Sequence, residues 1–141
     1  MSVIMKKIIL LISISIVSLF VFTGCSKEKE EFSLVGTTWA AYHYHYNGIP
    51  PFDSYDVYRV WRFISDTEIE ETSRTNGPTG GLIGKPVVGT YLLKYPKLTV
   101  TITETTLLDE VEINVYECEF IDKQTFRTVY WKDDLIEFNL Q

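Results

Sequence analysis

The chain has 141 residues, of which 13 are basic and 19 are acidic, and its formal net charge is −6 at pH 7. Because a surface of that sign repels phosphate backbones, we do not expect the protein to bind nucleic acid. The length suits one domain, large enough to bury a core without a metal or a disulfide as a staple.

Near the N-terminus, residues 6–25 read KKIILLISISIVSLFVFTGC: two lysines, an apolar run, two small residues and a cysteine. This order is typical of a secretory signal peptide. The last four residues, Phe22 to Cys25, resemble the lipobox of bacterial lipoproteins, with phenylalanine at a position where leucine is usual. The resemblance implies that residues 1–24 are removed and that Cys25 carries lipid. A plain signal peptide or a single membrane-spanning helix is the alternative, since the apolar run approaches the ~17 residues that a span needs.

Residues 25–32 are expected to form a charged tether between the lipidated Cys25 and the folded domain, because the stretch SKEKEE cannot pack into a core. The tether resembles the acidic export signal of Bacteroidetes-type surface lipoproteins. That resemblance implies an outer-membrane lipoprotein of the cell envelope, held to the membrane by its lipid anchor. Whether it faces the periplasm or is exposed at the surface stays open.

Residues 33–141 are predicted to form an all-β domain of about eight strands. Stretches rich in Val, Ile, Thr and aromatic residues alternate with period two over 34–46, 55–65, 67–75, 87–95, 97–104, 110–121, 124–131 and 135–140. The connections are mostly short, and the longest predicted loop covers residues 76–86. A meander of this kind favours an antiparallel up-and-down barrel, with a β-sandwich as the alternative.

The alternation also makes local predictions. Residues 39–46 are expected to alternate without a break, which would place His43 and His45 on one face. Within 110–121 the apolar set changes parity, and such a slip indicates a β-bulge inside that strand. The two sets are Val111, Ile113 and Val115, and then Tyr116, Cys118 and Phe120. Cys118 is expected to be a small buried hydrophobe.

Two stretches resemble lipocalin-like proteins. Residues 34–39, LVGTTW, are similar to the opening strand of that family, with Gly-x-x-Trp in place of Gly-x-Trp. Residues 89–100, GTYLLKYPKLTV, resemble a hairpin of small lipocalin-like Bacteroidetes lipoproteins. The resemblance implies an eight-stranded calycin-type barrel, possible small-ligand binding and no assigned activity. It also implies that Arg59 or Arg127 covers Trp39 at the base of the barrel.

Aromatic residues crowd the first two predicted strands and occupy both of their faces, more than one core face requires. An excess of exposed rings marks a recognition surface. We therefore expect non-enzymatic binding of a small apolar or sugar-like ligand, or else a structural or interaction subunit of an envelope complex that uses its aromatic face on an unidentified protein partner. The candidate ligand-binding residues are Trp39, Tyr42, Tyr44, Tyr58, Trp61 and Phe63.

Other patterns predict no catalytic residue, metal or cofactor. His43 and His45 have a spacing that zinc accepts, but no third histidine exists, and Asp53, Asp56 or Cys118 would have to complete the site. The segment 80–85 lacks the first glycine and the final hydroxyl of a phosphate loop. Several glutamates alternate along strands, which favours a solvated face over a glycosidase pair: Glu68, Glu70, Glu110, Glu112, Glu117 and Glu119.

Overall fold

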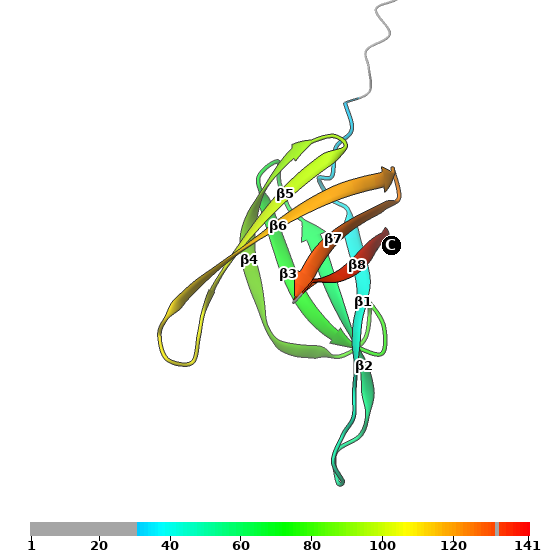
Figure 1. Ribbon diagram of the computed structural model, residues 1–141, viewed down its shortest axis with the longest axis vertical. Helices are drawn as coiled ribbons and strands as arrows, with labels where there is room; N and C mark the ends of the chain where they lie inside the picture. The colour runs from blue at the N-terminus through cyan, green and yellow to red at the C-terminus, as the bar shows by residue number, and fades with distance from the viewer. Residues whose placement is uncertain (1–30, 132) are drawn as a thin grey trace, which may run out of the picture. The chain divides into compact units, whose positions relative to one another are not determined.

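Eight antiparallel strands close into a barrel in simple chain order, each pairing with the next and β8 pairing with β1 (Figure 1). They are β1 Thr38–Tyr46, β2 Tyr55–Phe63, β3 Glu68–Thr75, β4 Leu82–Lys94, β5 Lys97–Thr105, β6 Val111–Asp122, β7 Thr125–Trp131 and β8 Asp134–Leu140. The predicted all-β up-and-down barrel is confirmed, and the sandwich alternative is wrong.

The computed structural model describes residues 31–131 and 133–141, and residues 32–141 form one compact unit. The expected signal peptide at 1–24, Cys25 and nearly all of the tether lie outside the described residues. Within the described part, no helix is long and apolar enough to cross a membrane.

The barrel has two distinct ends (Figure 1). The base is the end where Phe32 lies, together with the turns that follow β2, β4 and β6; Phe32 packs there against Tyr95 and Phe120 at 4.9 and 5.1 Å between ring centroids. The mouth is the opposite end, and from it the β1–β2 and β5–β6 hairpins project as ribbons. The β5–β6 ribbon forms because β4 pairs with β5 only as far as Ile102, and β7 pairs with β6 only from Cys118 onward.

Aromatic rings fill the barrel from its base to its middle. Trp61 stacks on Phe138 at 4.2 Å between ring centroids, and Phe138 stacks on Phe126 at 5.0 Å. All three are completely buried, and we call them the aromatic plug. Leu98, Val100 and Ile102 of β5 also face inward, as predicted from their alternation. The plug is part of one continuous cluster of buried side chains.

The alternation of β1 breaks at a bulge, which corrects the expected pattern. The β1–β2 register shifts between Tyr42 and Tyr44, so that Tyr44 lies opposite the buried Val57 and His45 lies opposite Asp56. Tyr44 therefore continues the inner face that Trp39 begins. The prediction that His43 and His45 share a face is wrong, because an inserted residue reverses which side chains point inward.

In β6 the predicted bulge between Val115 and Tyr116 is wrong. The pairing with β5 keeps one register from Val111 to Glu119, and the shift occurs later, against β7, between Phe120 and Asp122. The apolar residues of the first half instead face solvent: Val111, Ile113 and Val115 are 65%, 63% and 56% exposed. Sequence alone suggested a change of face because it was assumed that apolar side chains are buried.

The predicted loop 76–86 is shorter than expected, since β4 begins at Leu82. Gly84 and Pro86 belong to a bulge of β4, where the register against β3 shifts between Glu71 and Ser73. The φ angle of 72° at Gly84 suits glycine, and a bulge tolerates proline, which cannot donate to the ladder. Glycine and proline usually end a strand, but here they lie in a bulge that bends β4.

Candidate ligand site at the barrel mouth

A pocket of about 330 Å³ lies at the mouth. Five strands supply its lining, which combines aromatic, charged and amide side chains: His43, Tyr44, Arg59, Glu104, Glu112, Asn114, Tyr116 and Tyr130. Tyr116 packs on Trp61 at 5.6 Å between ring centroids, so the lining meets the aromatic plug. The volume is near the lower limit for small-ligand sites, which suits a molecule of monosaccharide or disaccharide size.

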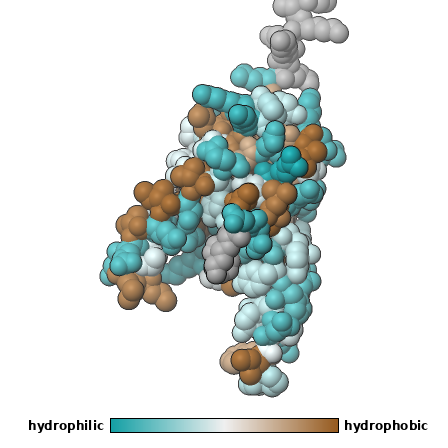
Figure 2. Space-filling model, in the orientation of Figure 1, coloured by the Kyte–Doolittle hydropathy of each residue, from teal (hydrophilic) through white to brown (hydrophobic). Residues whose placement is uncertain are grey.

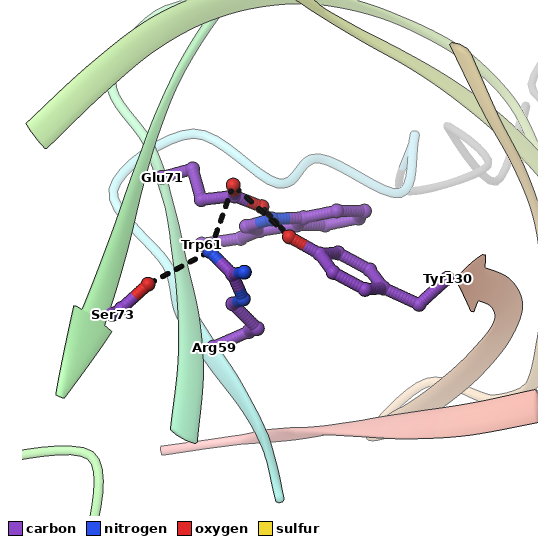
Figure 3. A network of polar contacts seen from close by, with 5 residues as sticks. All are labelled: Arg59, Trp61, Glu71, Ser73 and Tyr130. Carbon is purple, nitrogen blue, oxygen red and sulfur yellow. Dashed lines mark hydrogen bonds and ion pairs between the residues drawn. The ribbon is translucent and has the colours of Figure 1, made fainter. Parts of the chain in front are cut away.

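A buried carboxylate organises the wall of this region (Figure 3). Glu71 on β3 is 3% exposed and lies directly opposite Trp61 on β2. Its carboxylate accepts hydrogen bonds from Trp61 Nε1 at 2.5 Å and from the Tyr130 hydroxyl at 3.0 Å. Arg59 Nη1 is 3.5 Å from Glu71 Oε1 and donates to Ser73 Oγ at 2.7 Å. Two hydrogen-bond donors and one guanidinium charge, from two other strands, therefore compensate the buried carboxylate.

The protonation states follow from this arrangement. Burial raises the pKa of Glu71, against the opposing effects of the Trp61 hydrogen bond and the Arg59 charge. Burial, and then the charge of Glu71, raises the pKa of both Tyr116 and Tyr130, so their hydroxyls stay protonated and can donate. Burial, and then the Arg59 charge, lowers the pKa of His43, so this imidazole is neutral near pH 7.

Arg59 has hydrogen-bonding capacity that the described residues do not use. Its guanidinium lies 5.0 Å from the centroid of the Tyr130 ring, in cation–π geometry. Arg59 Nε and His43 Nδ1 are buried and have no hydrogen-bond partner among the described residues. Because buried polar groups are nearly always paired, these two atoms mark the pocket wall as a place where polar contacts remain to be made.

The β5–β6 ribbon adds an acidic rim. Glu104 and Glu112 lie directly opposite each other on neighbouring strands, and both line the pocket. Asn114, two residues along β6, faces the same side. Like charges opposite each other are unfavourable unless a donor lies between them, so the rim favours ligands rich in hydrogen-bond donors.

The six residues predicted for ligand binding have different positions. Trp39 and Phe63 are buried near the base, and Trp61 belongs to the plug. Tyr44 lines the pocket. Tyr42 and Tyr58 pair across strands on the outside of the barrel, at 5.7 Å between ring centroids. The structure therefore brings only Tyr44 and, beneath the pocket, Trp61 to the mouth.

Sequence reasoning missed most of the lining. Arg59 had a signal, because it alternates with Val57, Trp61 and Phe63 along one face of its predicted strand. Glu71 had a weaker signal. It alternates with the apolar Ile69, but the glutamates that the sequence pattern singled out in this strand were Glu68 and Glu70. The other members come from strands far apart in the chain, so only the closed barrel brings them together.

Other expectations for single residues are also settled. Arg127 lies on the outside, 3.7 Å from Glu119, and Arg59 lies at the mouth, so neither covers Trp39. The indole of Trp39 donates instead to Thr37 Oγ1 at 2.8 Å. Cys118 is a buried free thiol, as predicted, and burial raises its pKa to about 12.

The two histidines do not form a joint metal site. His43 lines the pocket, whereas His45 Nδ1 is 2.7 Å from Asp56 Oδ1 on the β1–β2 ribbon. Among the residues that the structure describes, no three His, Cys, Asp or Glu side chains are arranged to hold a metal ion.

Comparison of the chain with family models, curated proteins and solved structures finds no match. The pocket geometry is therefore the basis for a functional assignment.

Proposed function

We propose that this protein is a non-enzymatic, lipocalin-like lipoprotein of the outer membrane that binds a small sugar-like molecule at the barrel mouth. The observation that carries the proposal is the composition of the pocket. Tyr44, Tyr116 and Tyr130 line it beside the charged and amide groups of Arg59, Glu104, Glu112 and Asn114. A sugar offers C–H groups to the first set and hydroxyls to the second.

The interior argues against the apolar ligand that was the other expectation. The aromatic plug fills the part of the barrel where an acyl chain or a sterol would be buried. At the mouth, an apolar molecule would remove water from Arg59, Glu104 and Glu112 without replacing their hydrogen bonds, which is costly. A hydroxylated ligand replaces those bonds.

The test is a ligand titration that follows the intrinsic tryptophan fluorescence of the barrel unit of residues 32–141, in which Trp61 lies beneath the pocket. The panel contains neutral and acidic mono- and disaccharides, a fatty acid and a bile acid. We expect a saturable response to saccharides, and we expect Tyr44→Ala to weaken it at least tenfold. Tyr42→Ala is the matched control, because Tyr42 is an exposed tyrosine of the same strand that does not line the pocket. No saccharide response, or equal loss in both variants, contradicts the proposal.

The lipid anchor at Cys25 is a separate part of the proposal. It is supported by the lipobox-like sequence, and the barrel unit begins at Phe32, which packs at the base against Tyr95 and Phe120. Anchoring at that end leaves the mouth accessible to soluble ligands. Metabolic labelling with an alkyne fatty acid should mark the wild-type chain in the outer-membrane fraction. Cys25→Ser should abolish the label and release the protein; an unlabelled wild type would refute the anchor.

A second candidate function is an interaction subunit of an envelope complex that uses its outward aromatic residues. It is favoured by the exposed rings of Tyr42 and Tyr46 and by Ile49 and Phe52 at the end of the β1–β2 ribbon. Cross-linking on intact cells should then capture one stoichiometric partner, and Phe52→Ser should abolish the capture. Capture that is independent of Phe52 would exclude this surface.

A further inference from the structure

The first half of β6 combines an exposed apolar row with an unpaired backbone edge. Figure 2 shows apolar side chains gathered on the projecting β5–β6 ribbon. The row consists of Val111, Ile113 and Val115, each more than half exposed, and Leu107 and Leu108 at the turn are more exposed still. Contiguous exposed apolar surface of this kind marks an interaction site.

The edge of β6 is free on the side away from β5. Pairing with β7 covers Cys118 to Asp122, and no described strand pairs with residues 111–116 on that side. Such an edge offers unpaired N–H and C=O groups to a further strand. Natural edges of this length are usually protected by charge or proline, but here the only charged residue from 111 to 116 is Glu112.

The sequence of the edge is complementary to itself. When two identical antiparallel strands pair about a twofold axis, the axis passes midway between one residue and its own copy on the other strand. A centre at Ile113 places Val111 opposite Val115 and Glu112 opposite Asn114, so apolar side chains meet and the carboxylate meets an amide.

Neighbouring centres do not give this match. A centre at Glu112 places the two Glu112 carboxylates opposite each other. A centre at Asn114 places Val111 opposite Glu117. Each copy carries a net charge of −6, so two copies already repel each other. A register that also sets acid against acid is therefore disfavoured.

We propose that two copies of this chain pair antiparallel through β6, centred on Ile113, and form a dimer with a continuous sheet across the two barrels. Glu112 and Asn114 face the pocket side of β6, so Asn114 of the partner subunit would lie against Glu112 and complete the rim of the mouth. Five paired residues a side make less than a standard interface, so we expect a dissociation constant of about 10–100 µM.

The first test is sedimentation velocity of the barrel unit between about 1 and 500 µM. Wild type should shift from monomer to dimer over this range. Ile113→Lys should remain monomeric at all concentrations, because it sets two ammonium groups opposite each other. Ile121→Lys is the matched control. Ile121 is also an exposed isoleucine of β6, but it belongs to the part of the strand that pairs with β7. This variant should dimerise like wild type.

The register is tested by disulfide trapping, since Cys118 is buried and will not interfere. Ile113→Cys should form a disulfide-linked dimer with itself under mild oxidation, whereas Val111→Cys should link only when mixed with Val115→Cys. Circular dichroism checks that each variant is folded. A wild type that stays monomeric to 500 µM, a dimer that survives Ile113→Lys, or equal trapping at all positions overturns the proposal.

Discussion

Glu71 is the residue on which the charge balance inside the barrel depends. It is almost fully buried and faces Arg59, Trp61 and Tyr130. We expect Glu71→Gln to lower the free energy of unfolding by about 1–3 kcal/mol, because the amide puts an N–H donor in place of one of the acceptor oxygens that face Trp61 and Tyr130. Urea unfolding at pH 7 measures this.

The adjacent Glu70 is the matched control. It pairs with the exposed Arg62 at 3.2 Å on the outer face, a kind of ion pair that contributes little. Glu70→Gln should therefore change the free energy of unfolding by less than about 0.5 kcal/mol. Equal effects of the two substitutions would show that the Glu71 network does not stabilise the fold.

The same carboxyl group gives a pH dependence with a definite sign. Burial raises the pKa of Glu71 in the folded state above the ordinary value of 4.5. A raised pKa favours folding below 4.5, and this contribution is lost as the pH rises through the folded-state pKa. The stability advantage of wild type over Glu71→Gln should therefore be largest near pH 4 and decrease towards pH 7. Urea titrations of both proteins at several pH values test this, and an advantage that grows with pH contradicts it.

At the scale of one strand, β6 separates an inner and an outer face without a bulge. Tyr116 is buried and stacks on Tyr130 at 4.9 Å between ring centroids, whereas its neighbour Val115 is exposed. We expect Tyr116→Ala to cost about 2–4 kcal/mol of unfolding free energy, because it leaves a cavity next to the plug. Val115→Thr should cost less than about 0.5 kcal/mol. Unfolding at 1 µM, below the concentration range of the proposed dimer, compares them; similar costs would mean that both side chains are buried.

Strand positions could be predicted from sequence where alternation and turn residues agree, as in β5, whose inward Leu98, Val100 and Ile102 are confirmed. The prediction of which side chains point inward failed where residues of one chemical type, aromatic or apolar, cover both faces of a strand. The bulge near Tyr42 was invisible because aromatic residues stand on either side of it. The outward row of β6 was misassigned because apolar residues were assumed to be buried. The candidate site was mostly unpredictable, since Arg59 and Tyr130 meet only after closure.

For the whole molecule, the closing seam between β1 and β8 is the shortest ladder of the barrel. It contains the pairs Trp39–Leu140 and Ala40–Asn139, and Gln141 N donates to Thr38 O at 3.0 Å. The seam nevertheless lies beside two of the largest buried side chains, Trp39 and Phe138. A few backbone hydrogen bonds at the C-terminus therefore complete the enclosure of the aromatic core.

Removal of residues 139–141 should open this seam and lower the free energy of unfolding by about 2–4 kcal/mol, since each lost backbone hydrogen bond contributes about 1 kcal/mol. Unfolding should stay a single transition, because one core serves the whole barrel. In wild type, hydrogen exchange should be faster for the amides of Thr38 to Ala40 than for the Trp61–Glu71 pair in the middle of β2 and β3. Leu107→Ser combined with Leu108→Ser, at the opposite end, is the control and should change neither quantity by much. If the truncated chain is as stable as wild type, the barrel does not depend on its closing seam.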